Sequence, residues 1–266
     1  MRRRRNYLPL WSLLAVGLVA VACVSALGPV RIGSYELKDS GIFAALTEPR
    51  AAFQPSQDVA VADTGTVVEA PVSAPAEVDT APKTILFIGD SMLDGLYPRL
   101  AAYSAHNGHT LYAVIWYSST SEKWGGSGRL KSYIDRLGPD YIFICLGANE
   151  LFVKDIASKR EGHVKTLLGE IGDIPYLWIG PPNWKPDTGI NNLISANAAP
   201  GTFFLSNGMS FERGKDGAHP TRSSAAEWMD SVVRWMPANH PHPIRLELPP
   251  MASGRAKRVF VHQPDE

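Results

Sequence analysis

The chain has 266 residues, with 26 lysines and arginines against 26 aspartates and glutamates, so its formal net charge is zero. Four of the basic residues are the consecutive Arg2, Arg3, Arg4 and Arg5, and the rest of the chain has 22 basic against 26 acidic residues. A nucleic-acid-binding domain concentrates basic side chains on one face. The charge pattern therefore argues against a nucleic-acid partner, and the length allows one or two domains.

An uncharged apolar run follows these arginines and extends from Tyr7 to Val30. As a helix it would span roughly 36 Å, enough to cross a hydrocarbon core of about 30 Å, and the arginines would stay in the cytoplasm. We predict that residues 1–30 form a single-pass signal anchor in the cytoplasmic membrane, with the rest on the periplasmic, extracytoplasmic side. A cleaved signal peptide, whose apolar core is usually about 7–15 residues, and lipidation at Cys23 stay open as alternatives.

Residues 31–82 separate this anchor from the main domain. Residues 31–46 are expected to form a short membrane-proximal element. Residues 47–82 are rich in alanine, proline, threonine and acidic residues and lack helical or strand periodicity. This composition predicts an extended, disordered linker.

Apolar strand patterns alternate with helical patterns through residues 83–237, the predicted catalytic domain. Strands are expected at residues 84–88, 110–115, 141–146, 176–179 and 203–205, and helices at 93–107, 129–137, 159–171 and 223–235. Such alternation predicts an α/β fold, a three-layer α/β/α sandwich around a parallel sheet of about five strands. The tail, residues 238–266, is expected to be irregular and non-catalytic.

Ser91 ends the first predicted strand, in the sequence Gly89-Asp90-Ser91. Open parallel sheets keep their active sites at the carboxyl ends of strands. Ser91 is therefore a candidate nucleophile, which needs a neighbouring base. A serine that caps the next helix is an equally good interpretation of the position alone. The flanking residues lack the Gly-x-Ser-x-Gly elbow of α/β-hydrolases.

His219 is the candidate base for Ser91. It lies in Asp216-Gly217-Ala218-His219-Pro220, a predicted tight turn before the last helix, and Asp216 is suitably spaced to orient it. An isolated histidine would otherwise be interpreted as an exposed loop residue. No pair of histidines has zinc-ligand spacing with a third ligand nearby, and we expect neither a metal nor a cofactor.

Asn149 follows the third predicted strand, in Gly147-Ala148-Asn149-Glu150. An asparagine amide at the carboxyl end of a strand can donate a hydrogen bond to a developing oxyanion. A turn or helix-capping asparagine is equally compatible with this position.

These three segments, in this order, resemble the SGNH (GDSL-type) hydrolase family, whose fold is flavodoxin-like, over residues 83–237. The resemblance implies that Ser91 is the nucleophile, His219 the base and Asp216 the residue that orients it. It also implies that the Asn149 side chain and the Ser91 N–H belong to the oxyanion hole.

Two positions depart from the family pattern. The family usually has a glycine after the second strand, whose N–H completes the oxyanion hole, whereas this chain has Trp116-Tyr117-Ser118-Ser119. The spacing assigns that role to Ser119. Glu150 stands where the family more often has aspartate.

Tryptophans occur near the predicted site loops. Trp124 and Trp184 could stack on sugar rings or pack in the core, and neither interpretation is favoured. Trp116 is expected to be a core residue.

We predict a serine esterase of the cell envelope that removes acetyl or other short acyl groups from carbohydrate through an acyl-enzyme. Its partners would be an O-acylated carbohydrate or small ester, and the membrane. One alternative is an envelope polysaccharide O-acetyltransferase of the same fold. The other is a non-catalytic envelope scaffold or glycan-binding module.

Overall fold

The computed structural model describes residues 30–32, 35–37 and 76–265. The chain divides into two compact units, 1–69 and 70–266. In the first unit, β1 (Val30–Ile32) pairs antiparallel with β2 (Tyr35–Leu37). Except for Val30, the predicted membrane anchor lies outside the described residues, as does the predicted linker up to residue 75. No helix within the described ranges is long and apolar enough to cross a bilayer.

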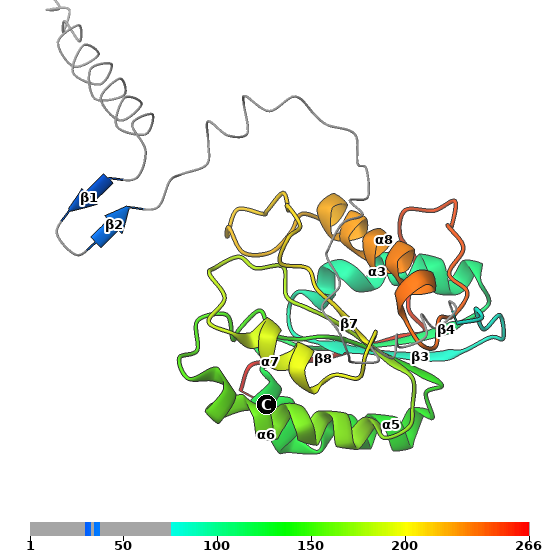
Figure 1. Ribbon diagram of the computed structural model, residues 1–266. Coiled ribbons are helices and arrows are strands. Elements are labelled where there is room, and N and C mark those ends of the chain that lie inside the picture. Colours follow the sequence, from blue (N-terminus) through cyan, green and yellow to red (C-terminus); the bar gives the residue numbers. More distant parts are fainter. Residues whose placement is uncertain (1–29, 33–34, 38–75, 266) are drawn as a thin grey trace, which may run out of the picture. The chain divides into compact units, whose positions relative to one another are not determined.

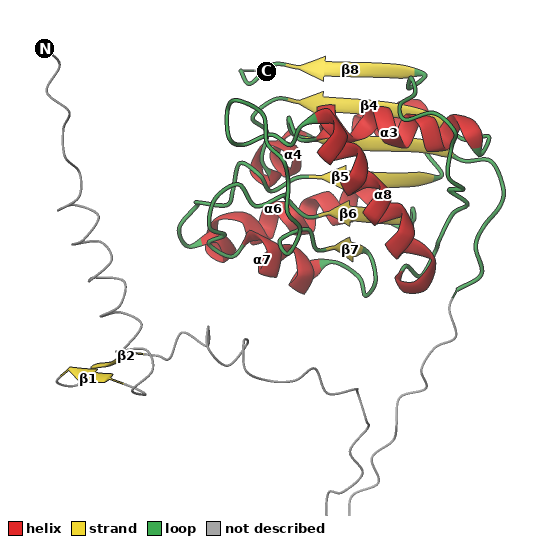
Figure 2. Cartoon of the chain, turned by 90° about the horizontal axis from the view of Figure 1, so that it is seen from above, coloured by secondary structure: helices red, strands yellow, loops and turns green. Residues whose placement is uncertain are grey.

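The second unit is built around a parallel sheet of six strands. In spatial order, β7-β6-β5-β3-β4-β8, every neighbouring pair is parallel (Figure 2). The strands are β3 (Thr84–Gly89), β4 (Thr110–Trp116), β5 (Tyr141–Cys145), β6 (Tyr176–Ile179), β7 (Phe203–Phe204) and β8 (Arg258–His262). The predicted parallel α/β fold is confirmed, with one more strand than expected.

Helices cover both faces of this sheet, as parallel sheets require because every strand is joined to the next by a crossover. In Figure 1, α3 and α8 lie on one face and α5 and α6 on the other. The helices are α3 (Leu93–His106), α4 (Ser121–Ser127), α5 (Arg129–Leu137), α6 (Ile156–Ile171), α7 (Ile190–Asn197) and α8 (Arg222–Asn239).

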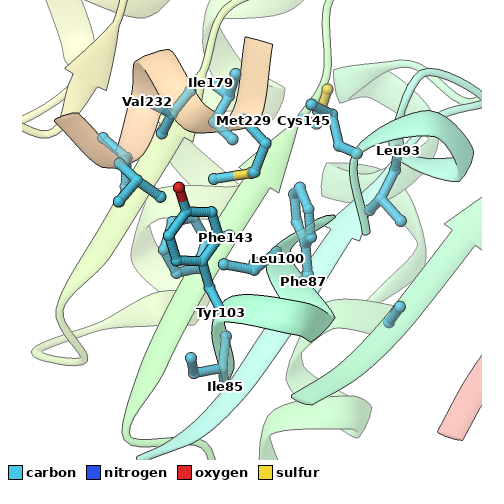
Figure 3. Packing of buried hydrophobic residues seen from close by; sticks show 14 of the residues in the cluster. Ile85, Phe87, Leu93, Leu100, Tyr103, Phe143, Cys145, Ile179, Met229 and Val232 are labelled. Carbon is cyan, nitrogen blue, oxygen red and sulfur yellow. The ribbon is translucent and has the colours of Figure 1, made fainter. Parts of the chain in front are cut away.

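The core consists of two apolar layers, one on each side of the sheet. Between the sheet and the pair α3 and α8, Phe87 meets Phe143 edge to face with ring centroids 5.8 Å apart (Figure 3). On the other side, Trp124 and Trp178 are fully buried. All five residues of β5 are buried, which explains its uninterrupted apolar sequence.

The C-terminal tail differs from the prediction because it contributes β8 to the sheet. β8 pairs in parallel with β4, from Tyr112 opposite Arg258 to Trp116 opposite His262. Its sequence, Arg-Val-Phe-Val-His, is rich in β-branched and aromatic residues, which favour strands. The prolines and histidines that precede β8 in the tail were the reason for expecting the whole tail to be irregular.

The end of the predicted linker is also part of the domain. Asp79 donates its N–H to the Pro243 carbonyl at 2.8 Å and accepts the Arg245 N–H at 2.9 Å. The ordered domain therefore includes residues before Lys83. The short helices α4 and α7 were not predicted. Each spans only about two turns, which gives little apolar periodicity to detect.

The carboxyl ends of three central strands, β3, β4 and β5, lie at one edge of the sheet. In the register, Gly89 of β3 lies opposite Ile115 of β4 and Cys145 of β5. The loops that follow these strands therefore meet beside Ser91, which stands two residues beyond Gly89.

Candidate active site

Ser91 lies in the turn between β3 and α3. The turn approaches β5 closely, because a Cβ atom built on Gly89 would lie 2.3 Å from the Cys145 carbonyl oxygen. Only glycine fits there without a shift of the backbone. The first helical residue is Leu93, its capping position is Met92, and no side chain caps this helix. The helix-cap interpretation of Ser91 is therefore wrong.

His219 and Asp216 share a compact turn that immediately precedes α8. The Oδ1 atom of Asp216 accepts hydrogen bonds from the N–H groups of Ala218, at 2.9 Å, and His219, at 3.0 Å. Gly217 adopts the left-handed conformation, with φ of 69°, that glycine permits. The turn thus holds the carboxylate and the imidazole on one short piece of chain.

The Arg213 guanidinium ties this turn to the loop after β6. It donates to the Ala218 carbonyl, and its Nη2 donates to the Pro182 carbonyl at 2.8 Å and the Asn183 carbonyl at 3.2 Å. This bridge fixes the position of the histidine turn relative to the strand ends.

Ser91, His219 and Asp216 form a continuous hydrogen-bonded chain. The His219 Nε2 atom lies 2.7 Å from Ser91 Oγ, and the His219 Nδ1 atom lies 2.7 Å from Asp216 Oδ2. The His219 and Asp216 side chains are half exposed, so the chain of hydrogen bonds lies at the molecular surface.

The protonation of Asp216 determines which imidazole nitrogen carries the proton. The N–H of Ala218 and the His219 ring hydrogen bond lower the pKa of Asp216 to about 2. An ionised carboxylate only accepts hydrogen bonds, so His219 Nδ1–H must be the donor. In the neutral ring, Nε2 then has a free lone pair, which accepts the Ser91 hydroxyl proton. This is the arrangement that activates a serine nucleophile.

Asn149 lies in the turn after β5, at the same edge of the sheet as the Ser91 turn. Its amide nitrogen donates one hydrogen to the Ser119 carbonyl oxygen at 3.0 Å, and this bond orients the side chain. An amide nitrogen carries two hydrogens. The second one is therefore left for another acceptor, as the oxyanion role requires.

Ser119 does not have the geometry of an oxyanion donor. It is fully buried, and its N–H already donates to the Trp116 carbonyl at 3.1 Å. Its hydroxyl accepts a hydrogen bond from the Trp124 indole at 3.0 Å. The prediction for this residue is wrong because spacing along the chain does not reveal which N–H of a turn is already bonded.

Ser118, one residue earlier, has the features that Ser119 lacks. It is exposed and has φ of 55°, in the left-handed region that favours glycine. Neither its N–H nor that of Ser91 donates a hydrogen bond to any residue in the described part of the chain. Ser118 follows β4, whose Ile115 lies opposite Gly89 of β3 in the strand register. The sequence signal was the block Trp116-Tyr117-Ser118-Ser119, where the family usually has a glycine, but spacing alone pointed to Ser119.

The three tryptophans have different surroundings. Trp124 is fully buried in the core, so of its two interpretations core packing is right and stacking on a sugar is wrong. Trp116 is also buried, as expected. Trp184 is partly exposed, and its indole donates to the Ala148 carbonyl at 2.9 Å, next to Asn149. Of the two candidate substrate-binding tryptophans, only Trp184 has a side chain that solvent can reach.

Two buried acids lie behind the site. Asp90 accepts the Met92 N–H through one oxygen, and its other oxygen has no hydrogen-bond partner within the described part of the chain. Burial, together with the Glu150 carboxylate, raises the pKa of Asp90 to about 7. Glu150 accepts the N–H of Ser121 at 3.0 Å and its hydroxyl at 2.7 Å, and lies 2.9 Å from the Arg160 guanidinium. Burial raises the pKa of Glu150 as well.

A cavity of about 540 Å³ opens directly from Ser91 and His219. It runs between the first turns of α3 and α8 to the tail around Ser253. Charged and hydroxyl-bearing side chains line it together with small residues, among them Asp94, Tyr97, Arg222, Ser223, Ala252 and Ser253. The serine therefore faces a polar groove large enough for a substrate group.

Several solved structures are similar to this chain, among them the following two. One is the psychrotrophic esterase EstA from Pseudoalteromonas sp., in a structure inhibited by monoethylphosphonate. It has 18% sequence identity and a TM-score of 0.41, and the match covers 57% of this chain and 94% of EstA. The other is TesA, with 19% identity, a TM-score of 0.43, and coverage of 57% of this chain and 97% of TesA. No protein-family model and no curated protein matches the sequence.

Proposed function

We propose that this protein is a serine ester hydrolase of the SGNH type. The observation that carries the proposal is the hydrogen-bonded chain from Ser91 through His219 to Asp216, with both distances at 2.7 Å. The order of the motifs along the sequence supports it independently. A scaffold or glycan-binding module does not require an ionised carboxylate, an oriented imidazole and a serine hydroxyl that are hydrogen-bonded to one another.

The reaction follows from the positions of these groups. Ser91 Oγ attacks the ester carbonyl carbon while its proton passes to His219 Nε2, and the imidazolium is stabilised by the Asp216 carboxylate. The carbonyl oxygen becomes an oxyanion, for which the Asn149 amide and the N–H groups of Ser91 and Ser118 are the donors. The alcohol leaves with the proton from His219. Water, activated by the same imidazole, then releases the acid.

The groove favours a polar, hydroxyl-rich alcohol. A long alkyl chain in contact with Asp94, Arg222 and Ser223 would remove the water that is hydrogen-bonded to these groups. It would offer them no hydrogen-bond partner in return. A sugar supplies hydroxyl groups to the same side chains. We therefore propose an O-acylated carbohydrate as the substrate, carrying an acetyl or other short acyl group.

The proposed location rests on the N-terminal sequence. Arg2 to Arg5 followed by an uncharged apolar run support a signal anchor, with the catalytic domain on the extracytoplasmic side of the membrane. A substrate in the cell envelope would agree with that location.

The first test is hydrolysis of p-nitrophenyl acetate by the full chain and by Ser91→Ala. Ser91→Ala removes only a hydroxyl group, so its circular dichroism and melting temperature should match the native protein. We expect release of p-nitrophenol to fall to the uncatalysed rate. Full activity in the folded variant would contradict the mechanism.

A second test addresses the substrate class. Ala252→Trp would fill the groove, and Ala157→Trp on the exposed face of α6 is the matched control. We expect the groove variant to raise KM for an acetylated oligosaccharide and to leave p-nitrophenyl acetate hydrolysis nearly unchanged. Equal kinetics of the two variants on the oligosaccharide would contradict carbohydrate binding in the groove.

A further inference from the structure

We propose that the C-terminal residues 262–264 position the oxyanion donors by holding both ends of the β4–α4 loop, residues 117–120. This inference rests on the proposed esterase function and assigns a role to the tail that its sequence did not suggest. Trp116 and Lys123 are the positioning residues through which the tail acts.

Three contacts join the tail to the ends of this loop. The Tyr117 N–H donates to the His262 carbonyl at 3.1 Å, which extends the β4–β8 pairing into the loop. The Trp116 indole donates to the Gln263 carbonyl at 3.0 Å. On the far side of the loop, the Lys123 ammonium donates to the Pro264 carbonyl. The tail therefore bridges the residues before and after the loop.

The hydrogen bond from the Trp116 indole to the Gln263 carbonyl is not part of the pairing between β4 and β8. The paired residues end at Trp116 and His262, whereas Gln263 lies past the strand. Trp116 is only 3% exposed, so without the Gln263 carbonyl its indole N–H would be buried with no partner. The indole also meets the Trp124 ring edge to face, with centroids 5.5 Å apart. Its position is therefore fixed from two directions.

A displacement of Trp116 would also displace two oxyanion donors, because the turn that follows Trp116 holds both of them. The Trp116 carbonyl accepts the Ser119 N–H, which closes the turn around Ser118. The Ser119 carbonyl in turn accepts the Asn149 amide at 3.0 Å. The Ser118 N–H and the Asn149 side chain are thus both placed by a turn whose first residue is held by the tail.

The conformation of Ser118 explains why such support is needed. A non-glycine residue with φ near 55° is strained, and such strain persists only when the surrounding structure enforces it. The contacts of Trp116, Tyr117 and Lys123 with the tail supply that constraint at both ends of a four-residue loop.

The test compares full-chain Trp116→Phe and Lys123→Met with Arg258→Ala, at the opposite end of β8. Trp116→Phe retains an aromatic ring at this buried position, and it removes the N–H donor together with part of the ring volume. We expect kcat for p-nitrophenyl acetate to fall between about 5-fold and 100-fold, because a small misplacement of catalytic groups is costly. KM should stay within about twofold, and affinity for a trifluoromethyl ketone, a tetrahedral-intermediate analogue, should fall in parallel with kcat. Arg258→Ala should retain native kinetics.

A native kcat in Trp116→Phe would overturn the inference. So would an equal loss of activity in Arg258→Ala, which would mean that β8 matters only for closing the sheet edge. Amide hydrogen exchange provides a readout that does not depend on activity: residues 117–120 should exchange faster in Trp116→Phe than in the native chain. Unchanged exchange there would also contradict the positioning role. Failure of the proposed esterase function would give a different result, because Ser91→Ala would then be as active as the native protein.

Discussion

The Nε2 atom of His219 lies 2.7 Å from the hydroxyl oxygen of Ser91, although the two residues are 128 positions apart in the sequence. The contact exists because β3 ends directly before the serine turn and the histidine turn precedes α8, which packs with α3 on the same face of the sheet.

Asp216→Asn should lower kcat by about 10²-fold to 10⁴-fold, because an amide can present a donor to His219 Nδ1 and disfavour the tautomer that activates Ser91. Its melting temperature should change little, since the side chain is half exposed. Activity of the native protein should show no ionisation of Asp216 above pH 4, because its pKa is about 2. Steady-state kinetics from pH 4 to 9 check both points. A native kcat in Asp216→Asn would refute the orienting role.

Asn149→Ala should reduce kcat by about 10²-fold to 10³-fold, the usual effect of removing one oxyanion donor. The change also releases the Ser119 carbonyl from its hydrogen bond. KM for a small acetyl ester should stay nearly constant, because the interaction strengthens only in the transition state. An increase in KM without a change in kcat would indicate a substrate-binding role instead.

Ser118→Gly should retain activity and stabilise the protein by up to about 1 kcal/mol, since glycine adopts a positive φ without strain. Ser118→Pro should be nearly inactive because proline has no N–H and cannot adopt φ of 55°. The measurements are kcat for p-nitrophenyl acetate and urea unfolding of each variant. An active, folded Ser118→Pro would show that this N–H is not an oxyanion donor.

Asp90→Asn should remove a pH dependence of stability. The unfolded aspartate has a pKa of about 3.9, whereas burial raises the pKa of Asp90 to about 7 in the folded protein. Between these values the folded state holds a proton that the unfolded state has released, so native stability falls as pH rises from 4 to 7. The asparagine variant keeps the acceptor for Met92 N–H and lacks this titration.

Urea unfolding of both proteins at pH 4.5, 6.0 and 7.5 measures that difference. The stability of Asp90→Asn relative to the native protein should increase with pH, by on the order of 4 kcal/mol at most. Parallel stability curves would mean that Asp90 ionises in the folded protein as easily as in the unfolded one.

The sequence predicted the features that depend on local pattern. Buried strands such as β3 and β5 have uninterrupted apolar sequences, and the Ser91 and His219 motifs lie next to elements with clear periodicity. Gly89 and Gly217 marked turns where a side chain would clash or strain the backbone. The local pattern therefore identified the turns that contain Ser91 and His219, whereas the roles of these residues were implied by the resemblance to a known family.

Features that depend on distant contacts could not be predicted in the same way. β8 is a five-residue edge strand whose partner, β4, lies more than 140 residues earlier, and nothing in its local pattern identifies that partner. Whether the Ser118 or the Ser119 N–H is available as an oxyanion donor depends on a hydrogen bond inside one turn. The burial of Trp124 depends on packing between two helices and the sheet, whereas its sequence neighbours are polar.

The most direct test of the esterase mechanism is covalent labelling of the full chain with a fluorophosphonate, followed by intact-mass and peptide mass spectrometry. An activated serine displaces fluoride and retains the phosphonate, so we expect a single adduct, located on Ser91. The adduct should be absent from Ser91→Ala and form far more slowly in His219→Ala. Folded native protein that remains unlabelled at Ser91, or labels equally fast without His219, would contradict the account.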